Sequence, residues 1–366
     1  MDENNKNNDA FIKNLRSSID EIDEKIIHLI NQRLSLAFDI GKAKLLEGKQ
    51  IFDSARESII IQRLNNLNKG LLKKEALLNI FTEIISACRE IQGPLKISYL
   101  GPEATFSHIA ALSYFGRLAF FIPQSSFSDI FDDVEKGTSN YGVVPVENSI
   151  EGAINYTLDL FFESKLKICG EKYVPISHDL LVKSGDLKDI TEIYSHPQVF
   201  PQCRKWLKKY LPNVSLKECS STAHAAKQAA ITPNSAAISS SEAAHIYNLK
   251  VVASKIEDHS RNTTRFLIIG NDEIKRTGTD KTSLIFVTSH IPGALYKVLE
   301  PIAKANINML KLESRPTKYE NWSYFFIVDL EGHIEDSLVR ETISKMQPLC
   351  LYLKCLGSYP RGEDKR

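Results

Sequence analysis

The feature that most restricts the fold is a proline-free segment, residues 11–46, whose apolar side chains recur at helical spacing. One set of its apolar residues keeps intervals of three, four or seven, which predicts one very long helix; the set is Ile12, Leu15, Ile19, Ile22, Ile26, Ile30, Ala37 and Ile40. A helix of this length usually packs against a partner helix, from the same chain or from another one. The amino-terminal part of the chain is therefore expected to associate through helices.

Two shorter helices are expected to complete this unit. One begins after Asp53, which is a suitable N-cap, and extends to residue 67. The other covers residues 73–91 and is stopped by Gly93 and Pro94. We thus expect residues 1–93 to form an all-α domain of three helices of unequal length.

The cations of this domain are spaced in an informative way. Arg33 and Lys44 are 11 residues apart, about three helical turns, so both can reach one ligand. Arg16 precedes Arg33 by 17 residues, roughly 26 Å along a straight helix and about 100° around it. If Arg16 serves the same site, it must come from a second, antiparallel chain, which would make a dimer part of the site.

The segment LRSSIDEIDEKIIHLINQRLSLAFDIGKAK resembles the first helix of the all-helical chorismate mutase family, and the resemblance covers nearly all of residues 11–92. Chorismate has two carboxylates and rearranges through a cyclic, charge-polarised transition state, so fixed cations and hydrogen-bond donors suffice for catalysis. The resemblance implies that the active-site positions are Arg16, Arg33, Lys44, Asp53, Arg56, Glu57 and Gln92.

The resemblance also implies roles for these residues. Arg33, Lys44 and Arg56 would bind the carboxylates and the ether oxygen, while Glu57 and Gln92 would address the hydroxyl and the ether oxygen. Cys88 stands where some members of the family have serine, and its role is left open. The alternative is a helical hairpin that serves only dimerisation, with its charges facing solvent.

Residues 95–271 alternate between strand and helix patterns, which predicts an α/β domain. A helix is expected at 105–115, capped by Thr105 or Ser107. The expected strands cover residues 96–100, 118–122, 141–146, 167–174, 193–196, 214–219, 236–238, 251–253 and 266–269.

One of these strands ends in a polar triplet. In YGVVPVENSIEGAINYTLDLFF, residues 141–162, the apolar run stops at Glu147, Asn148 and Ser149. Ligands of open α/β sheets bind at the carboxyl ends of strands, so a substrate site is expected here. The alternative is a simple helix cap supplied by Ser149 or Asn155. A second polar segment, RNTTRFLIIG at 261–270, places Thr264 and Arg265 at the start of another apolar strand.

Together with GPEATFSHIAA (101–111), SHPQVFPQC (195–203) and SSTAHAA (220–226), these segments resemble the signature of prephenate dehydratase. The resemblance implies two lobes like those of type II periplasmic binding proteins, with residues 174–251 as the second lobe and the site in the cleft between them. Prephenate loses its ring hydroxyl and carbon dioxide together, driven by aromatisation, so neither a cofactor nor a metal is expected.

The resemblance assigns the catalytic position to Thr264, which would hydrogen-bond the departing hydroxyl. Glu147 would orient donors or supply the proton, and Arg265 would organise a carboxylate or hold the loop. The neutral donors expected to bind carboxylates are Asn148, Ser195, Gln202 and Thr222. Ordinary capping is the alternative for each of them. The histidines of this domain show no metal-site spacing, and cap or surface positions are expected for His108, His178, His196, His224, His245 and His259.

Residues 280–360 follow the order βαββαβ, which predicts an α+β unit of the ferredoxin-like type. Strands are expected at 282–289, 307–315, 322–331 and 349–357, and helices at 293–305 and 337–346. GALY at 293–296 and ESRP at 313–316 resemble the phenylalanine-binding motifs of the ACT domain, a regulatory module. The implied effector residues are Gly293, Ala294, Leu295, Glu313, Ser314, Arg315 and Pro316. The alternative is a simple turn before a helix.

Composition agrees with a chain of two or three globular domains. The 366 residues include 46 basic and 45 acidic ones and are 43% hydrophobic, so neither nucleic acid nor membrane is an expected partner. The six cysteines are scattered, the first ten residues do not resemble a signal peptide, and no apolar run approaches ~18 residues. A cytoplasmic location is therefore expected.

These resemblances together imply a multidomain, bifunctional enzyme of phenylalanine biosynthesis. It would convert chorismate to prephenate by a Claisen rearrangement and prephenate to phenylpyruvate by decarboxylating dehydration, as a homodimer or higher oligomer inhibited by phenylalanine. Arogenate as a dehydratase substrate stays open. The alternative is a non-catalytic amino-acid sensor, which would need neither Glu147 and Thr264 nor the cation set of the first helix.

Overall fold

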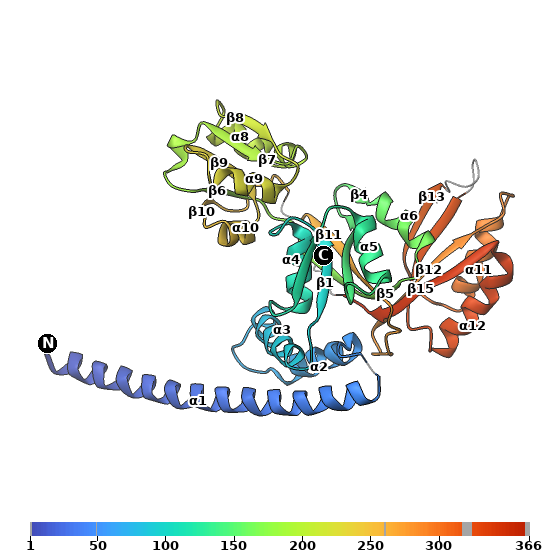
Figure 1. Ribbon diagram of the computed structural model, residues 1–366, viewed down its shortest axis with the longest axis horizontal. Coiled ribbons are helices and arrows are strands. Elements are labelled where there is room, and N and C mark those ends of the chain that lie inside the picture. The colour runs from blue at the N-terminus through green and yellow to red at the C-terminus, as the bar shows by residue number, and fades with distance from the viewer. Residues whose placement is uncertain (1, 49, 260, 317–323, 363–366) are drawn as a thin grey trace.

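The computed structural model describes residues 2–48, 50–259, 261–316 and 324–362, without the side chains of residues 2–7. Three helices lead into an α/β part with two sheets, and a third sheet with its own helices follows (Figure 1). None of the helices in the described part of the chain is both long and apolar enough to cross a membrane.

The long helix α1 spans Asp2–Leu46, so it begins nine residues before the predicted start. Its amino-terminal half extends away from the rest of the molecule, and only its carboxyl-terminal half runs beside α2 (Ser54–Leu67) and α3 (Lys74–Glu90) (Figure 1). Asp53 caps α2 as predicted, because its side chain accepts a hydrogen bond from the backbone N–H of Arg56 at 2.9 Å. The expected all-α unit of three helices is therefore present.

The first lobe of the α/β part is built on a sheet with the order β2-β1-β3-β11-β5, to which the short β4 adds beside β3. β1, β2 and β3 are parallel, whereas β11 runs antiparallel to both of its neighbours. The strands are β1 (Lys96–Leu100), β2 (Phe120–Gln124), β3 (Tyr141–Asn148), β4 (Gly152–Ala153), β5 (Lys167–Pro175) and β11 (Thr263–Gly270). The helices are α4 (Phe106–Phe115), α5 (Phe127–Glu135) and α6 (Asn155–Glu163).

The second lobe lies between β5 and β11 in the sequence and has its own sheet, with the order β10-β6-β9-β7-β8. Its strands are β6 (Asp179–Val182), β7 (Glu192–Ser195), β8 (Ser215–Glu218), β9 (Ser235–Ser239) and β10 (Lys250–Ala253). Its helices are η1 (Leu187–Asp189), α7 (Val199–Gln202), α8 (Arg204–Tyr210), α9 (Thr222–Ala229) and α10 (Ser241–Ile246). The strand β6 was not among the predicted strands.

The first two residues of the polar triplet, Glu147 and Asn148, are part of the sheet. β3 continues through Asn148 because Asn148 pairs with Thr264 of β11, so the predicted end at residue 146 is too early. Ser149 donates to the carbonyl of Arg261 at 3.2 Å, and the N-cap of α6 is Ile154 without a side-chain hydrogen bond. The alternative that Ser149 or Asn155 merely caps a helix is therefore wrong. Thr105 does cap α4, accepting from the N–H of His108.

The carboxyl-terminal unit is a four-stranded antiparallel sheet with the order β13-β14-β12-β15, the ferredoxin-like arrangement that was predicted. Its strands are β12 (Asp280–Val287), β13 (Met309–Pro316), β14 (Tyr324–Glu331) and β15 (Tyr352–Pro360). Its helices are α11 (Ala294–Lys304), α12 (Ser337–Met346) and η2 (Gln347–Leu349). The predicted start of the third strand at Trp322 lies outside the described residues.

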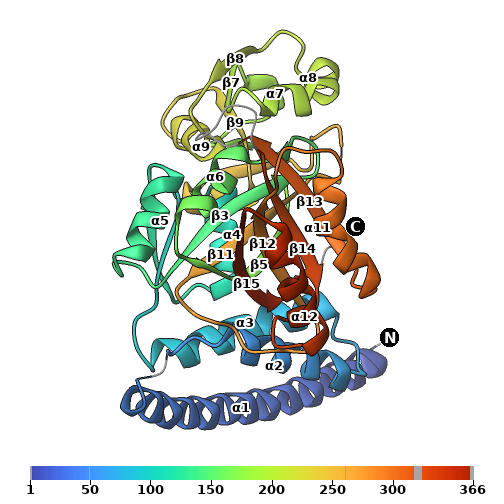
Figure 2. The same ribbon diagram turned by 90° about the vertical axis from the view of Figure 1, so that its right-hand side faces the viewer.

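This sheet is covered on both faces. Phe286 and Val328 join the core with residues of α11 and α12, whereas Phe325 and Ile327 on the opposite face join a core with Val146 and other residues of the first lobe. In Figure 2 the third domain faces the viewer, and the first-lobe sheet lies behind it. The contact is close enough to require glycine in β15: a Cβ added to Gly357 would lie 2.5 Å from the carbonyl oxygen of Ile168 in β5. The third domain is thus packed directly behind the first-lobe sheet.

Candidate active sites

The strand pair β3–β11 brings two predicted dehydratase residues together. Thr264 and Asn148 are register partners, and the amide nitrogen of Asn148 donates to Thr264 Oγ1 at 2.8 Å. The same nitrogen also donates to Oδ1 of Asn262, two residues before Thr264, at 2.8 Å. The Asn148 carbonyl oxygen accepts from the backbone N–H groups of Ile150 and Glu151. The Asn148 amide is thus fixed in the orientation that presents its N–H to Thr264.

A hydrogen-bonded chain continues from here to the second lobe. Gln202 at the end of α7 accepts from Asn262 Nδ2 at 3.4 Å, and its own amide nitrogen donates to Glu151 at 3.3 Å. His178 Nε2 lies 3.0 Å from the same Gln202 oxygen. Burial lowers the pKa of His178, which favours a neutral ring that donates its N–H to that oxygen. Gln202 therefore joins the two lobes beside Asn148 and Thr264, which its predicted role requires.

Two further residues, Ser195 and Thr222, were predicted to bind the substrate. Ser195 is fully buried and donates its hydroxyl to the carbonyl of Ile238 at 2.8 Å, so the expectation that it binds substrate does not fit this arrangement. Thr222 is 9% exposed in the first turn of α9, whose N-cap is Ser221. Its role in substrate binding stays a prediction.

Glu147 and Arg265 face the other side of the sheet. They are register partners of each other, next to Asn148 and Thr264, and side chains alternate between the two faces of a strand. Glu147 pairs with Lys311 of β13 at 2.9 Å, and the buried Arg265 pairs with Glu171 and Asp329. Both side chains point to the third domain, so direct contact with a substrate is not supported for either. The other expected roles, orienting donors for Glu147 and holding the loop for Arg265, stay predictions.

The predicted mutase residues gather where α1 crosses α3. Arg33 contacts the sulfur of Cys88 at 2.6 Å, and Lys44 donates to the carbonyl of Ile51 at 2.7 Å. Gln92 donates from its amide to the Cys88 carbonyl at 2.8 Å, and its amide oxygen is buried without a partner among the described residues. The amide oxygen of Gln92 can thus accept a hydrogen bond from a ligand.

Glu57 is the central acid of this group. Its side chain is 22% exposed and lies 3.4 Å from the Nε of Arg89. Burial raises its pKa from 4.5 to about 7, more than the nearby cations Arg89, Arg33 and Lys44 lower it. Because folding raises this pKa, the folded state favours the protonated carboxyl. The resulting contribution to stability is complete at pH values below the pKa of the unfolded chain, and it is lost as the pH rises through the folded pKa of about 7.

The other predicted mutase residues lie at the edge of the group or beyond it. Asp53 uses a carboxylate oxygen to cap α2, and Arg56 in the first turn of that helix is exposed. Arg16 is exposed on the half of α1 that extends away from the remaining helices (Figure 1). The chain thus supplies most of one mutase site, without Arg16.

The predicted effector motifs lie at one end of the third sheet. Gly293 is the N-cap of α11 with φ 80°. A Cβ added to it would have no neighbouring atom within 4 Å. Ser314 is exposed, whereas Arg315 turns to the first lobe and lies 3.4 Å from Asp159 of α6. The expected effector contact of Arg315 is therefore not supported by its position.

Several residues of these sites were not predicted. Asn262 lies within the NTTRF segment, and its nearness to Thr264 in the sequence was the available signal. Arg89 lies in the last turn of α3 and precedes Gln92 by only three residues, which was a usable signal as well. His178 was expected to cap or lie at the surface, but it is buried, as is His108, which stacks on Tyr99. Nothing in the sequence pointed to Lys311.

Comparison with known families divides the chain in the same way. Residues 15–93 match chorismate mutase type II, residues 97–274 match prephenate dehydratase, and residues 282–346 match the ACT domain. A solved structure of prephenate dehydratase from Arthrobacter aurescens, in complex with L-Phe, superposes with a TM-score of 0.68 at 33% identity over 73% of this chain and 90% of that one. A prephenate dehydratase from Staphylococcus aureus gives a TM-score of 0.64 at 29% identity, over 72% of this chain and all of that one.

Curated relatives match along nearly the whole length. The bifunctional chorismate mutase/prephenate dehydratase of Aquifex aeolicus is 45% identical over 96% of this chain and 98% of its own length. The proteins of the same name from Pseudomonas aeruginosa and Escherichia coli K12 are 43% and 34% identical, over 96% and 94% of this chain and 98% and 95% of their own lengths. These matches favour the enzyme over the amino-acid sensor. With its helical, dehydratase and ACT domains in one polypeptide, the chain belongs to the family of bifunctional chorismate mutase/prephenate dehydratases.

Proposed function

We propose that the hydrogen-bonded chain of Thr264, Asn148, Asn262 and Gln202 forms the dehydratase site and that the group around Glu57 forms one mutase site. The observation that carries the first assignment is the 2.8 Å contact from the Asn148 amide to the Thr264 hydroxyl. That contact leaves the hydroxyl proton of Thr264 free to be donated to a substrate. Prephenate is the dehydratase substrate in this proposal, since the same chain produces it.

In the dehydratase step, the bond from the ring to the hydroxyl and the bond from the ring to the carboxylate both break. Carbon dioxide leaves, its bonding electrons complete the aromatic ring, and the departing hydroxide takes up a proton to become water. Thr264 donates a hydrogen bond to this hydroxyl, and Asn148 stabilises the negative charge that develops on Oγ1. A threonine is too weak an acid to ionise fully, so the proton that it gives is replaced through a relay.

In the mutase step, no group is transferred, and the site needs to hold one conformation of chorismate while charge develops at the ether oxygen. Arg33, Lys44 and Arg56 supply positive charge for the carboxylates and that oxygen. The unpartnered oxygen of the Gln92 amide accepts a hydrogen bond from the hydroxyl of chorismate, and its N–H reaches the ether oxygen only if it leaves the Cys88 carbonyl. Neutral Glu57 hydrogen-bonds the hydroxyl of chorismate without repelling its carboxylates.

The site is completed by Arg16 of a second copy of the chain. The amino-terminal half of α1 exposes a row of large apolar side chains, among them Phe11 (61% exposed), Leu15 (50%), Ile19 (55%) and Ile22 (53%). Such a row is unusual on a helix that meets only water. The antiparallel α1 of a second copy would cover it and bring Arg16 to the Arg33 of its partner.

Phenylalanine is the proposed effector. Gly293 has free space around its Cα and starts α11, where backbone N–H groups can bind a carboxylate. The exposed Ser314 lies at the same end of the sheet. Inhibition requires that phenylalanine bind one arrangement of the domains better than another, by a coupling of ~1 to 3 kcal/mol.

The cytoplasm is the proposed location of the enzyme. Its six cysteines are free thiols, and three of them, Cys88, Cys169 and Cys203, are buried. Unpaired cysteines in this number suit a reducing compartment.

The dehydratase assignment predicts that Thr264→Ala lowers the kcat for phenylpyruvate formation by about 10² to 10³, because a donor to the leaving group is lost. Thr264→Ser should keep much more activity, since it retains the hydroxyl. Thr263→Ala is the matched control, because this neighbouring threonine faces the other side of β11. Chorismate turnover by the same samples reports on folding. Equal and high dehydratase activity of the alanine and serine variants would refute the assignment.

The raised pKa of Glu57 predicts a pH dependence of the mutase. As the pH rises through about 7, Glu57 ionises and repels the dianionic substrate, so the KM for chorismate should increase. Glu57→Gln stays neutral and should show a flatter KM between about pH 6 and pH 8. Prephenate turnover over the same range is the internal control. An unchanged rise of KM in the glutamine variant would assign the titration to another group.

The shared mutase site predicts complementation between two inactive chains. Arg16→Ala and Arg33→Ala should each lose several kcal/mol of transition-state stabilisation, while the dehydratase stays active. Mixed dimers of the two variants should regain one intact site of the two. Subunit exchange is verified with tagged chains. If exchange occurs without recovery of chorismate turnover, Arg16 does not act from the partner.

The effector assignment predicts phenylalanine binding that calorimetry can detect at millimolar concentration or below. Gly293→Val forces a β-branched residue into a positive φ and blocks the helix start, so together with Ser314→Ala it should abolish binding. Ser344→Ala, on the exposed side of α12, is the control. Binding that survives in the double variant would place the effector site elsewhere.

A further inference from the structure

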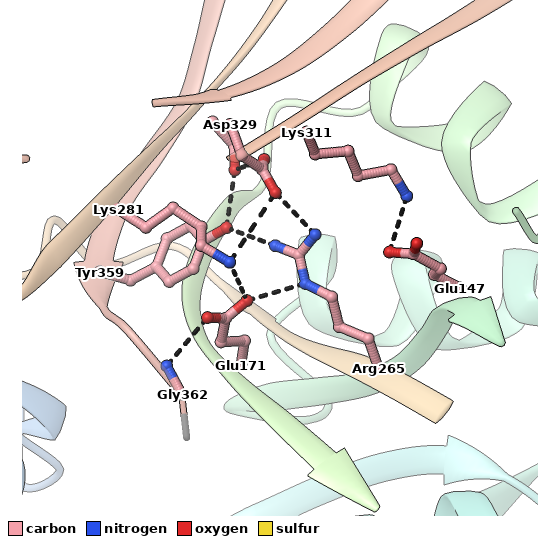
Figure 3. A network of polar contacts seen from close by, with 9 residues as sticks. Glu147, Glu171, Arg265, Lys281, Lys311, Asp329, Tyr359 and Gly362 are labelled. Atoms are coloured by element: carbon pink, nitrogen blue, oxygen red, sulfur yellow. Dashed lines mark hydrogen bonds and ion pairs between the residues drawn. The ribbon is translucent and has the colours of Figure 1, made fainter. Parts of the chain in front are cut away.

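The side chains next to the proposed dehydratase residues form a buried charge cluster behind the sheet, composed of Arg265, Glu171, Lys281, Asp329 and Tyr359 (Figure 3). Arg265 and Glu171 come from the first lobe, and the other three come from the third domain. Each of the four charged side chains is at most 5% exposed. The cluster therefore lies entirely within the contact between two domains.

Arg265 is held from both domains at once. Its Nε donates to Glu171 at 2.8 Å, its Nη1 to Asp329 at 2.6 Å and its Nη2 to the Tyr359 hydroxyl at 3.0 Å (Figure 3). A planar guanidinium that donates from all three nitrogens has one position that satisfies its partners. Arg265 therefore fixes β11 of the dehydratase relative to β14 of the ACT sheet.

The partners of Arg265 are themselves fixed. Lys281 lies 2.9 Å from the Glu171 oxygen that Arg265 contacts, and the other Glu171 oxygen accepts from the N–H of Gly362. Ser283 donates to the second oxygen of Asp329 at 2.6 Å. Since every oxygen of the two carboxylates accepts from at least one donor, the cluster resists rearrangement.

A second ion pair holds the neighbouring strand β3 against the ACT sheet. Glu147 at the end of β3 pairs with Lys311 of the ACT strand β13 at 2.9 Å (Figure 3). Lys311 is 13% exposed, and no other carboxylate within salt-bridge distance of it is recorded in the described part of the chain. Between the two contacts lies a cavity of about 20 Å³ lined by residues including Arg265, Lys311, Ser283 and Asp329. This part of the interface is therefore held by polar contacts and not only by close apolar packing.

We propose that Glu147 and Arg265 are positioning residues of the dehydratase, and that the ACT sheet completes the active site from behind by supplying Lys311 and Asp329. This rests on the proposed roles of Thr264 and Asn148. Arg265 follows Thr264 directly in the chain, and Glu147 precedes Asn148, so each anchored side chain fixes the backbone of one reacting residue. The 2.8 Å contact between Asn148 and Thr264 is kept because both anchors end on one rigid sheet.

The competing explanation is that these ion pairs only hold two domains together. The two explanations differ in what a folded variant does. Loss of a domain contact alone lowers stability and leaves the turnover of the folded enzyme unchanged. A displaced Thr264 lowers kcat while the KM for prephenate is nearly kept, because the second lobe and Gln202 are untouched.

The test compares full-length variants at both anchors. Lys311→Met removes the partner of Glu147, Lys311→Arg restores the charge, and Asp329→Asn removes one charge from the cluster with little change of shape. Glu331→Gln is the matched control, since it lies two residues from Asp329 on β14 and breaks only the exposed pair with Arg361. Chorismate turnover in the same samples measures the amount of folded enzyme.

Lys311→Met and Asp329→Asn should each lower the dehydratase kcat about ten- to a hundredfold, since a displacement of about 1 Å is enough for such a loss. Their KM for prephenate and their mutase activity should stay within about twofold, and Lys311→Arg and Glu331→Gln should resemble the parent enzyme. If Asp329→Asn does not fold, the Lys311 pair of variants decides the question.

A normal kcat in folded Lys311→Met and Asp329→Asn would overturn the proposal, and so would a Lys311→Arg variant as impaired as Lys311→Met. The Thr264→Ala variant separates this outcome from a failure of the site itself. If Thr264→Ala is inactive while Lys311→Met is normal, the site assignment holds and the positioning role falls. If Thr264→Ala is active, the site assignment falls first.

Discussion

The pairing of β3 with β11 is the contact on which the rest of the dehydratase depends. The chain leaves the first lobe after β5, builds the whole second lobe, and returns as β11 between β3 and β5. This return closes the first sheet and brings residues more than a hundred positions apart, Asn148 and Thr264, to hydrogen-bonding distance. The register shift after Arg265 is a local irregularity next to the site, a common place for a bulge.

Because side chains alternate along these two strands, the two faces of the sheet carry different residues. Asn148 and Thr264 face the side of the proposed dehydratase site, and Glu147 and Arg265 face the ACT domain. Burial of the Arg265 charge is unfavourable unless the charge is paired. Removal of one partner from a buried ion pair lowers stability by about 3 to 5 kcal/mol, whereas an exposed pair contributes about 0 to 1 kcal/mol. Burial acts to raise the pKa of Asp329, but Arg265 and Lys281 outweigh it and lower that pKa. The cluster is thus electrostatically matched, and the ACT domain is built into the support of the catalytic strands.

The three proposed sites differ in how many of their residues a single chain supplies. The dehydratase residues converge within a single chain, because both lobes and the ACT sheet are folded around β3 and β11. The mutase group of one chain collects Arg33, Lys44, Glu57 and Gln92, but it leaves Arg16 on an exposed half-helix. The effector motifs likewise lie at an exposed end of the third sheet, beside surface residues such as Ile291 (59% exposed) and Tyr296 (69%). The proposed association of chains therefore concerns the helical and regulatory domains, whose candidate sites lie at exposed surfaces.

The sequence by itself determined the three domains, the long helix and the cap at Asp53, because these follow from periodicity, local capping chemistry and recognisable motifs. Its motifs also pointed to Thr264, Asn148 and Gln202 as candidate site residues. It did not determine which way neighbouring residues point. Glu147 and Arg265 lie inside the same motifs as Asn148 and Thr264, but their faces depend on a strand register set by a residue pair 116 positions apart. The burial of His178, the pairing of Lys311 and the raised pKa of Glu57 also depend on contacts between distant segments. Such contacts leave no local pattern, since burial and charge pairing are properties of the packed chain, and only the tertiary structure decided them.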